Sequence, residues 1–137
     1  MSDCNFKIKV DFWLSADELD LKEATNIIGI NPTNTRLKES FKIKEYAKIL
    51  WEYSTDYQYS YVIEFQLLQI KDILNNKCTQ IREYCDINNI EAGFDIIVRT
   101  RNYILPELII PIEFTKFAAK LNARIAFDIY VNLEEEF

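Results

Sequence analysis

The stretch from Pro111 to Val131, PIEFTKFAAKLNARIAFDIYV, constrains the fold more than any other part of the chain. From Ala123 onward apolar and polar residues alternate strictly, as in a strand with one buried face. The apolar side would hold Ile125, Phe127, Ile129 and Val131, and the polar side Arg124, Ala126, Asp128 and Tyr130. We expect one side of this strand to meet a core, and we expect the rest of the chain to be organised around it.

A helix is expected directly before this strand. Four apolar residues recur at helical spacing, namely Phe114, Phe117, Ala118 and Leu121. Pro111 suits the first position of a helix, and Asn122 can adopt the left-handed conformation that ends one. The pattern therefore predicts a helix that folds back over the apolar face of a sheet containing the 123–131 strand.

The amino-terminal part predicts a second strand of the same kind and a helix after it. Phe6, Ile8, Val10 and Phe12 alternate with Lys7, Lys9, Asp11 and Trp13. Ser15 and Glu18 have the spacing of a capping box, and Leu14 and Leu19 occupy the positions of a hydrophobic staple. We therefore expect a helix from about Ala16 to Ile28, ended by Gly29.

The middle of the chain supplies the remaining elements. They are a loop at Ile30 to Ser40, an extended segment at Tyr46 to Tyr53, a long helix at Tyr61 to Leu74 with Phe65 and Ile73 in its apolar stripe, a shorter helix ending at Asn88-Asn89, a strand at Phe94 to Arg99 and a short extended piece at Leu105 to Pro111. The economical packing is a single α+β domain over residues 1–137. It is a two-layer sandwich with helices on one face of a mixed or antiparallel sheet of four to five strands.

Length and composition support one domain with a substantial core. The chain has 137 residues, of which 49% are hydrophobic and 14% aromatic, and this argues against disorder. No apolar run approaches the roughly 20 residues that span a bilayer, and the amino-terminus does not resemble a secretion signal, so we expect a cytoplasmic protein without a membrane partner. The net charge of -6 argues against nucleic acid and leaves a basic protein partner open.

Most familiar catalytic constellations are missing from the sequence. Histidine is absent, and the two glycines form neither a phosphate-binding loop nor a dinucleotide-binding turn. Cys78 and Cys85 would share a helix face at a separation of about 10 Å, which is too far for a disulfide. The acidic residues Asp17, Glu18 and Asp20 fit the first turn of a helix better than an acid/base pair. We therefore expect no catalytic residues, no metal site and no cofactor, and we interpret the acidic run Glu134 to Glu136 as a solvated end.

The polar face of the predicted sheet is the first candidate binding surface. If the strands lie side by side, this face collects Lys7, Lys9, Asp11, Trp13, Lys48, Glu52, Asp95, Arg99, Arg124, Asp128 and Tyr130. Charged residues mixed with tryptophan and tyrosine are typical of protein-recognition surfaces. The residues we expect to bind a protein partner are Trp13, Asp11, Tyr130, Asp128 and Glu52. The alternative is that cross-strand ion pairs simply stabilise a solvated face.

The predicted loop after the first helix is the second candidate. Asn31, Thr33, Asn34 and Arg36 place several hydrogen-bonding groups beside Pro32 and could bind a small polar ligand. The alternative is an ordinary connecting loop.

Three segments together resemble a known family. They are IIGINPTNTR at Ile27 to Arg36, ILWEYS at Ile49 to Ser54, and PELIIPIEFTKFAAKLNARIAFDIY at Pro106 to Tyr130. Their order and spacing are similar to those of a bacterial family of small proteins, the domain of unknown function DUF4279. A glycine commonly follows the first segment in that family, where this chain has Leu37 to Ser40. The family has no established catalytic residues, so the resemblance assigns none here.

The leading functional hypothesis is a non-enzymatic interaction protein. Some small acidic bacterial proteins of this kind are thought to be immunity partners of secreted toxins, so the resemblance implies an immunity or antitoxin-like protein that blocks a basic toxin or enzyme domain. The alternative is a small-ligand-binding or regulatory domain that uses the 30–40 loop. The sequence leaves the oligomeric state and the strand order open.

Overall fold

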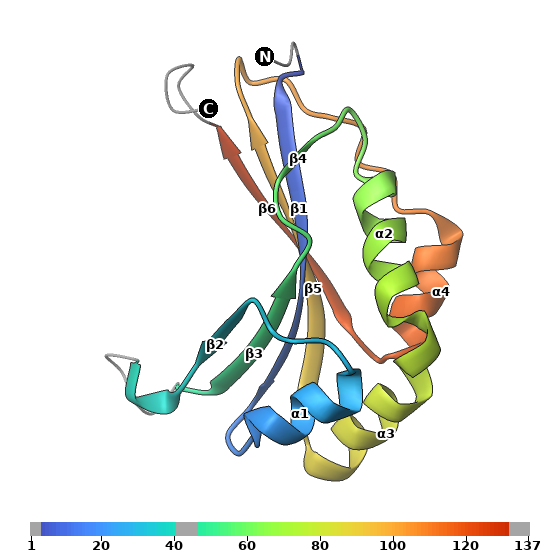
Figure 1. The fold of residues 1–137 in the computed structure, drawn as a ribbon. Helices are drawn as coiled ribbons and strands as arrows, with labels where there is room; N and C mark the ends of the chain where they lie inside the picture. Colours follow the sequence, from blue (N-terminus) through green and yellow to red (C-terminus); the bar gives the residue numbers. More distant parts are fainter. Residues whose placement is uncertain (1–3, 41–46, 132–137) are drawn as a thin grey trace.

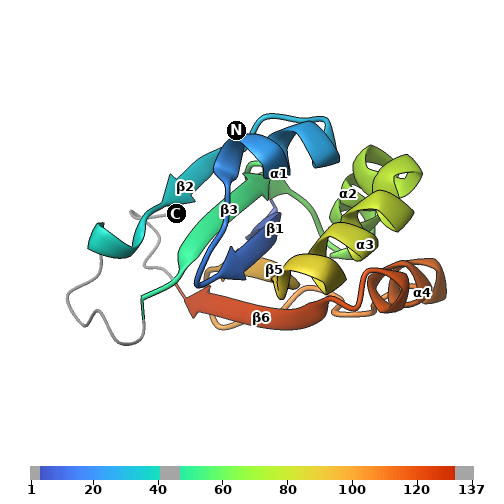
Figure 2. The same ribbon diagram turned by 90° about the horizontal axis from the view of Figure 1, so that it is seen from below.

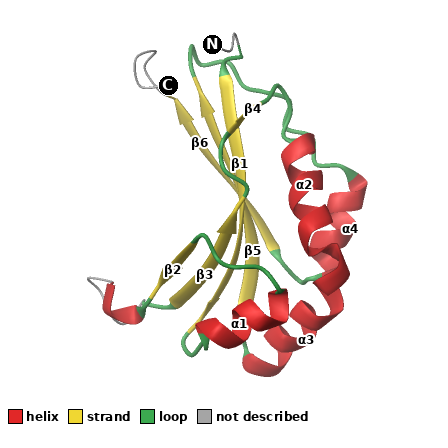
Figure 3. Ribbon diagram, in the orientation of Figure 1, coloured by secondary structure: helices red, strands yellow, loops and turns green. Residues whose placement is uncertain are grey.

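A computed structural model of the chain describes residues 4–40 and 47–131. The elements along the chain are β1 (Phe6–Ala16), α1 (Leu21–Ile28), β2 (Asn34–Arg36), the 3-10 turn η1 (Lys38–Ser40), β3 (Ile49–Ser54), β4 (Gln58–Tyr59), α2 (Glu64–Leu74), the 3-10 turn η3 (Asn75–Lys77), α3 (Cys78–Asn88), β5 (Glu91–Thr100), α4 (Ile112–Lys120) and β6 (Arg124–Val131). They form one sheet with helices packed on one of its faces (Figures 1 and 3). The predicted α+β class is confirmed.

The sheet is mixed and has six strands, one more than the largest number expected. Its order is β2-β3-β1-β5-β6, and β4 pairs with β1 beyond the end of β3. β1 runs antiparallel to β3, β4 and β5, whereas β6 runs parallel to β5. The expectation that the sheet is organised around the 123–131 strand is therefore wrong: β1 lies at its centre and β6 at its edge.

The core lies between β1, β5 and the helices. Phe94 on β5 lies at its middle, with its ring centroid 5.1 Å from that of Phe12 and 4.9 Å from that of Phe114. Phe117 of α4 lies 6.0 Å from the same ring. The buried indole of Trp51 donates a hydrogen bond to Thr25 Oγ1 at 3.0 Å, which ties β3 to α1. The aromatic residues that the sequence places on apolar faces thus pack the helices against the sheet.

The start of the first helix differs from the prediction. Ser15 and Glu18 form no capping box, because β1 continues through Ala16, which pairs with Ile49 of β3. α1 begins at Leu21 instead, and the carboxylate of Asp20 accepts hydrogen bonds from the backbone of Lys22 and Glu23. Asp17 and Glu18 precede the helix. Gly29 ends the helix in the left-handed conformation, as predicted.

The carboxy-terminal helix and strand form where the sequence predicts them, but the predicted burial of the strand is wrong. Phe127, Ile129 and Val131 are 39%, 42% and 47% exposed. α4 packs on Phe94 of β5, and β6 runs past the helices towards the far end of the sheet (Figure 1). On the apolar side of β6, Ile125 is half-buried, and the residues that follow it have little to pack against.

Several smaller predictions also need correction. The 30–40 loop contains β2 and η1, and the third extended segment is Ile49–Ser54, with Tyr46 outside the described residues. The long helix starts at Glu64 rather than Tyr61. Phe65, expected in its apolar stripe, is exposed, and Gln66 is buried.

The segment before α4 contributes only an isolated bridge, between Val62 and Glu107, in place of the expected extended piece. The run Glu134 to Glu136 lies outside the described residues. Within the ranges 4–40 and 47–131, none of the helices has the length and apolar character needed to cross a membrane.

Candidate functional site

The helices leave one face of the sheet uncovered, and we call it the outer face (Figure 2). The strand register places on it all of the predicted polar-face residues except Lys48, which precedes β3. These residues are Lys7, Lys9, Asp11 and Trp13 of β1, Glu52 of β3, Asp95 and Arg99 of β5, and Arg124, Asp128 and Tyr130 of β6. Side chains from four strands thus share one surface, as the alternation predicted.

Four carboxylates, of Asp11, Glu52, Asp95 and Asp128, form what we call the acidic centre of this face. Asp11 lies directly opposite Asp95 on the neighbouring strand and is only 4% exposed. Lys9 Nζ is 3.6 Å from Asp11 Oδ1, and within the described residues that oxygen accepts no hydrogen bond. The centre therefore holds more negative charge than Lys9 neutralises.

The crowding of these carboxylates changes their titration. Burial raises the pKa of Glu52, and the charge of Asp11 adds to the rise, while Lys9 and a hydrogen bond from Asn34 oppose it. Burial also raises the pKa of Asp95, with the hydrogen bond from Trp13 opposing and the charges of Asp128 and Asp11 adding to the rise. Both shifts mean that the ionised form is disfavoured here, so a cation brought from outside would relieve the repulsion.

Trp13 is held against the sheet beside the acidic centre. Its Nε1 donates to Asp95 Oδ1 at 3.2 Å, and its ring lies over Gly93, the residue opposite it on β5. The indole is half-buried and has a defined position. It provides a fixed aromatic surface next to the carboxylates.

The other end of the outer face carries interleaved cations and tyrosines, which we call the tyrosine-cation end. Lys9 lies over the ring of Tyr57 at 5.2 Å, and Lys7 over that of Tyr59 at 5.6 Å. Arg99 lies between Tyr57 and Tyr130, 5.4 and 5.6 Å from their ring centres, and its Nε donates to Tyr57 Oη at 3.0 Å. Tyr130, expected in the same site as Asp11, belongs to this end instead.

Tyr57 and Tyr59 also belong to this face, although the sequence pattern did not indicate them as site residues. Together with Lys7 and Arg99 they line a hollow of ≈ 440 Å³. The alternation Tyr57-Gln58-Tyr59 after a polar turn is the sequence signal for this short strand, but β4 has only two residues. So short a pattern does not stand out from a loop.

The predicted ligand residues of the 30–40 segment lie in or just before the edge strand β2. Thr33 is hydrogen-bonded to β3: its backbone N–H donates to Glu52 O at 2.8 Å, and its hydroxyl accepts from the backbone N–H of Ser54 at 3.0 Å. Asn34 and Arg36 lie at the edge of the outer face, opposite Glu52 and Leu50. Asn31 is exposed. A nearby hollow of ≈ 350 Å³ is lined by Leu21, Lys22, Thr25, Asn26 and Thr35, and by none of the four.

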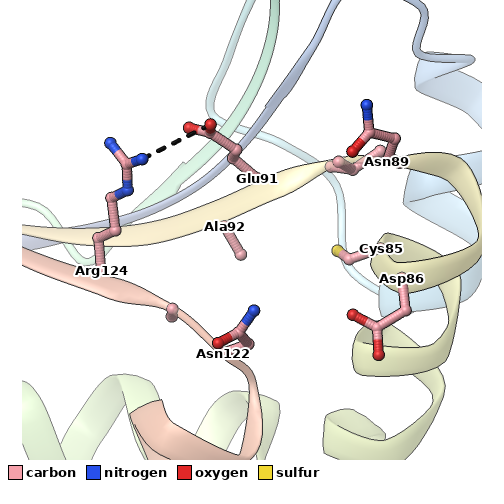
Figure 4. Close-up of a pocket in the computed structure, with 9 residues that line it drawn as sticks. Cys85, Asp86, Asn89, Glu91, Ala92, Asn122 and Arg124 are labelled. Atoms are coloured by element: carbon pink, nitrogen blue, oxygen red, sulfur yellow. Dashed lines mark ion pairs between the residues drawn. The ribbon is translucent and has the colours of Figure 1, made fainter.

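A further pocket of ≈ 470 Å³ lies where β5 and β6 begin, next to α3 (Figure 4). Arg124 and Glu91 form an ion pair at its rim, with 3.6 Å between Nη2 and Oε1. Burial, reinforced by the charge of Asp86, raises the pKa of Cys85 to about 11, so this thiol stays protonated at neutral pH and is a poor nucleophile. Among the described residues no three or more acidic or cysteine side chains are grouped to hold a metal.

Comparison with known proteins identifies a family relationship over nearly the whole chain. A family model described as "Domain of unknown function (DUF4279)" matches residues 6–132. The match begins at the first residue of β1 and extends past the last residue of β6. No curated protein and no solved structure matches the chain.

Proposed function

The chain belongs to the DUF4279 family, whose function is unknown, so we propose a function from the chemistry of its outer face. The protein is a non-enzymatic binding module that recognises a basic region of another protein. It acts as an immunity or antitoxin-like protein, covering a basic toxin or enzyme domain. The observation that carries this proposal is the acidic centre, in which Asp11 is almost fully buried opposite Asp95 and its charge contributes to the raised pKa of Glu52.

The acidic centre is suited to receive a lysine or arginine side chain. The raised pKa values of Glu52 and Asp95 report carboxylates that are partly desolvated and mutually repelled. A cationic side chain from a partner would form ion pairs with these carboxylates and neutralise the negative charge that Lys9 leaves unbalanced. Trp13 beside them supplies the kind of fixed aromatic contact that dominates the energy of many protein interfaces.

Net charge favours the same class of partner. At -6 the protein attracts basic surfaces over a distance, which accelerates association and makes it sensitive to salt. Blocking an enzyme requires only a complementary surface, which fits a chain without histidine and with a protonated Cys85. The small-ligand alternative has less support because the Thr33 hydroxyl accepts a hydrogen bond from the backbone of Ser54, and the hollow beside α1 is lined by none of the four predicted ligand residues.

The test is affinity purification of the tagged protein from its native host at low and moderate salt, with Trp13→Ala, Tyr130→Ala and Asp128→Lys in parallel. Glu113→Lys on α4 is the matched control, because it makes the same charge change on the helical side. We expect the wild type and the control to retain a stoichiometric basic protein that salt releases. We expect Asp128→Lys and Trp13→Ala to lose it. Retention by all three outer-face variants would show that this face is not the binding surface.

A further inference from the structure

The two edges of the sheet differ in how they are protected. Edge strands expose unpaired N–H and C=O groups, and proteins commonly shorten them or place proline, lysine or a bulge there. At one edge β2 has only three residues. At the other β6 has eight, none of them proline, glycine or lysine, and among the described residues no strand pairs with its outer side.

The side chains of β6 are also exposed on both faces of the sheet. On the helical side Phe127, Ile129 and Val131 present an apolar row that α4 does not reach. On the outer face Arg124 and Asp128 lie four residues apart, with the side chain of Arg124 73% exposed. A long, partly apolar edge of this kind favours pairing with another strand.

One antiparallel register of β6 against a second copy pairs its two charged residues, Arg124 and Asp128, with each other. Two copies that pair antiparallel around a twofold axis perpendicular to the sheet keep the same side chains on the same face. With the axis at Ala126, Arg124 of each copy lies opposite Asp128 of the other. Ile125 then lies opposite Phe127 on the apolar side. With the axis at Asp128, that residue would face its own copy and repel it.

We propose that the protein forms a symmetric homodimer in which two β6 strands pair antiparallel about Ala126. The two sheets join into one continuous sheet, held by main-chain hydrogen bonds, two Arg124–Asp128 ion pairs and the contact of Ile125 with Phe127. Both outer faces then lie on the same side of the dimer. This assembly rests on β6 alone, and Asp128 is the one residue that it shares with the proposed acidic centre.

The test is the oligomeric state of the purified full chain, measured by sedimentation over a concentration series. The wild type is expected to dissociate reversibly from dimer to monomer. Arg124→Asp and Asp128→Arg each place like charges opposite one another, and each is expected to raise the dimer dissociation constant on the order of tenfold or more. Glu39→Gln is the control, because Glu39 is exposed and lies in η1, next to β2 at the opposite edge of the sheet.

Two rescues distinguish specific pairing from damage to the fold. The double variant Arg124→Asp/Asp128→Arg exchanges the charges and is expected to dimerise like the wild type. A mixture of the two single variants is expected to form a heterodimer, in which both cross-strand pairs again have opposite signs. A wild-type protein that is monomeric at every concentration would overturn the proposal. So would single variants that dimerise as well as the wild type, or a failure of both rescues.

Discussion

Trp13 lies across Gly93, its direct neighbour on β5, so closely that a Cβ at position 93 would sit 2.2 Å from Trp13 Cζ2. The same ring donates its N–H to Asp95 at 3.2 Å. Gly93 is therefore required by the approach of the indole to the strand. Its role differs from that of Gly29, which has a φ of 83° and supplies a left-handed helix end.

Gly93→Ala is expected to lower the free energy of unfolding by about 1–3 kcal/mol, the usual cost of forcing a methyl group into a packed site. The indole must move and lose its bond to Asp95. Urea denaturation measures the change. In a Trp13→Ala background the same substitution should cost much less, because the clashing ring is gone. Equal costs in both backgrounds would contradict the proposed contact.

The acidic centre predicts how stability depends on pH. A carboxyl whose pKa is raised in the folded state binds its proton more tightly there than in the unfolded chain. The resulting contribution to the free energy of unfolding is fully present below the pKa of the unfolded chain, about 4. It is lost as pH rises through the raised pKa of the folded state. Asp95→Asn removes the ionisable group, so the variant does not lose stability through this group as pH rises. The amide oxygen of asparagine can still accept the hydrogen bond from Trp13 Nε1.

Thermal unfolding should therefore show Asp95→Asn to be more stable than the wild type near pH 7, with the difference shrinking as pH falls towards about 4. Asp56→Asn is the control, since Asp56 is exposed and has a φ of 67°, a conformation that asparagine tolerates. A variant no more stable than the wild type at neutral pH would show that repulsion at Asp95 is unimportant.

The position of the first helix cap can be tested by a matched pair of substitutions. Asp20→Ala removes the acceptor for two backbone N–H groups and should cost about 1 kcal/mol of stability. Glu18→Ala removes a carboxylate that is almost fully exposed and should change stability by less than about 0.5 kcal/mol. Chemical denaturation of the two variants decides which residue caps α1. A larger loss of stability in Glu18→Ala than in Asp20→Ala would support the capping box instead.

Cysteine labelling tests the environment of the pocket beside α3. With a pKa of about 11, only about one Cys85 in a thousand is a thiolate at pH 8, and the side chain is buried. Cys78 is more accessible. Alkylation of the native protein followed by peptide mass spectrometry should therefore find Cys78 modified before Cys85, which reacts at an ordinary rate only after unfolding. Rapid labelling of Cys85 in the native protein would reopen a chemical role for this pocket.

The sequence by itself determined the long strands and helices and which side of each long strand a residue occupies. Alternation has a period of two residues and is a local property, so Trp13, Asp11 and Asp128 could be placed on one polar face without knowing which strands are neighbours. Gly29 and Asn122 likewise marked helix ends through their own backbone preferences. The three family segments carried the relationship that the family model then showed.

Only the tertiary structure decided what those faces meet. Strand order depends on contacts between distant residues, so the sequence could not show that β6 lies at an edge with Phe127 exposed. Ser15 and Glu18 had the local pattern of a cap, but pairing with β3 and β5 kept Ser15 in a strand. Tyr57 became a site residue only because β1 and β5 bring Lys9 and Arg99 to its ring. Local patterns fix which side of a strand a residue occupies, whereas packing energy fixes which strands adjoin and therefore which charges meet.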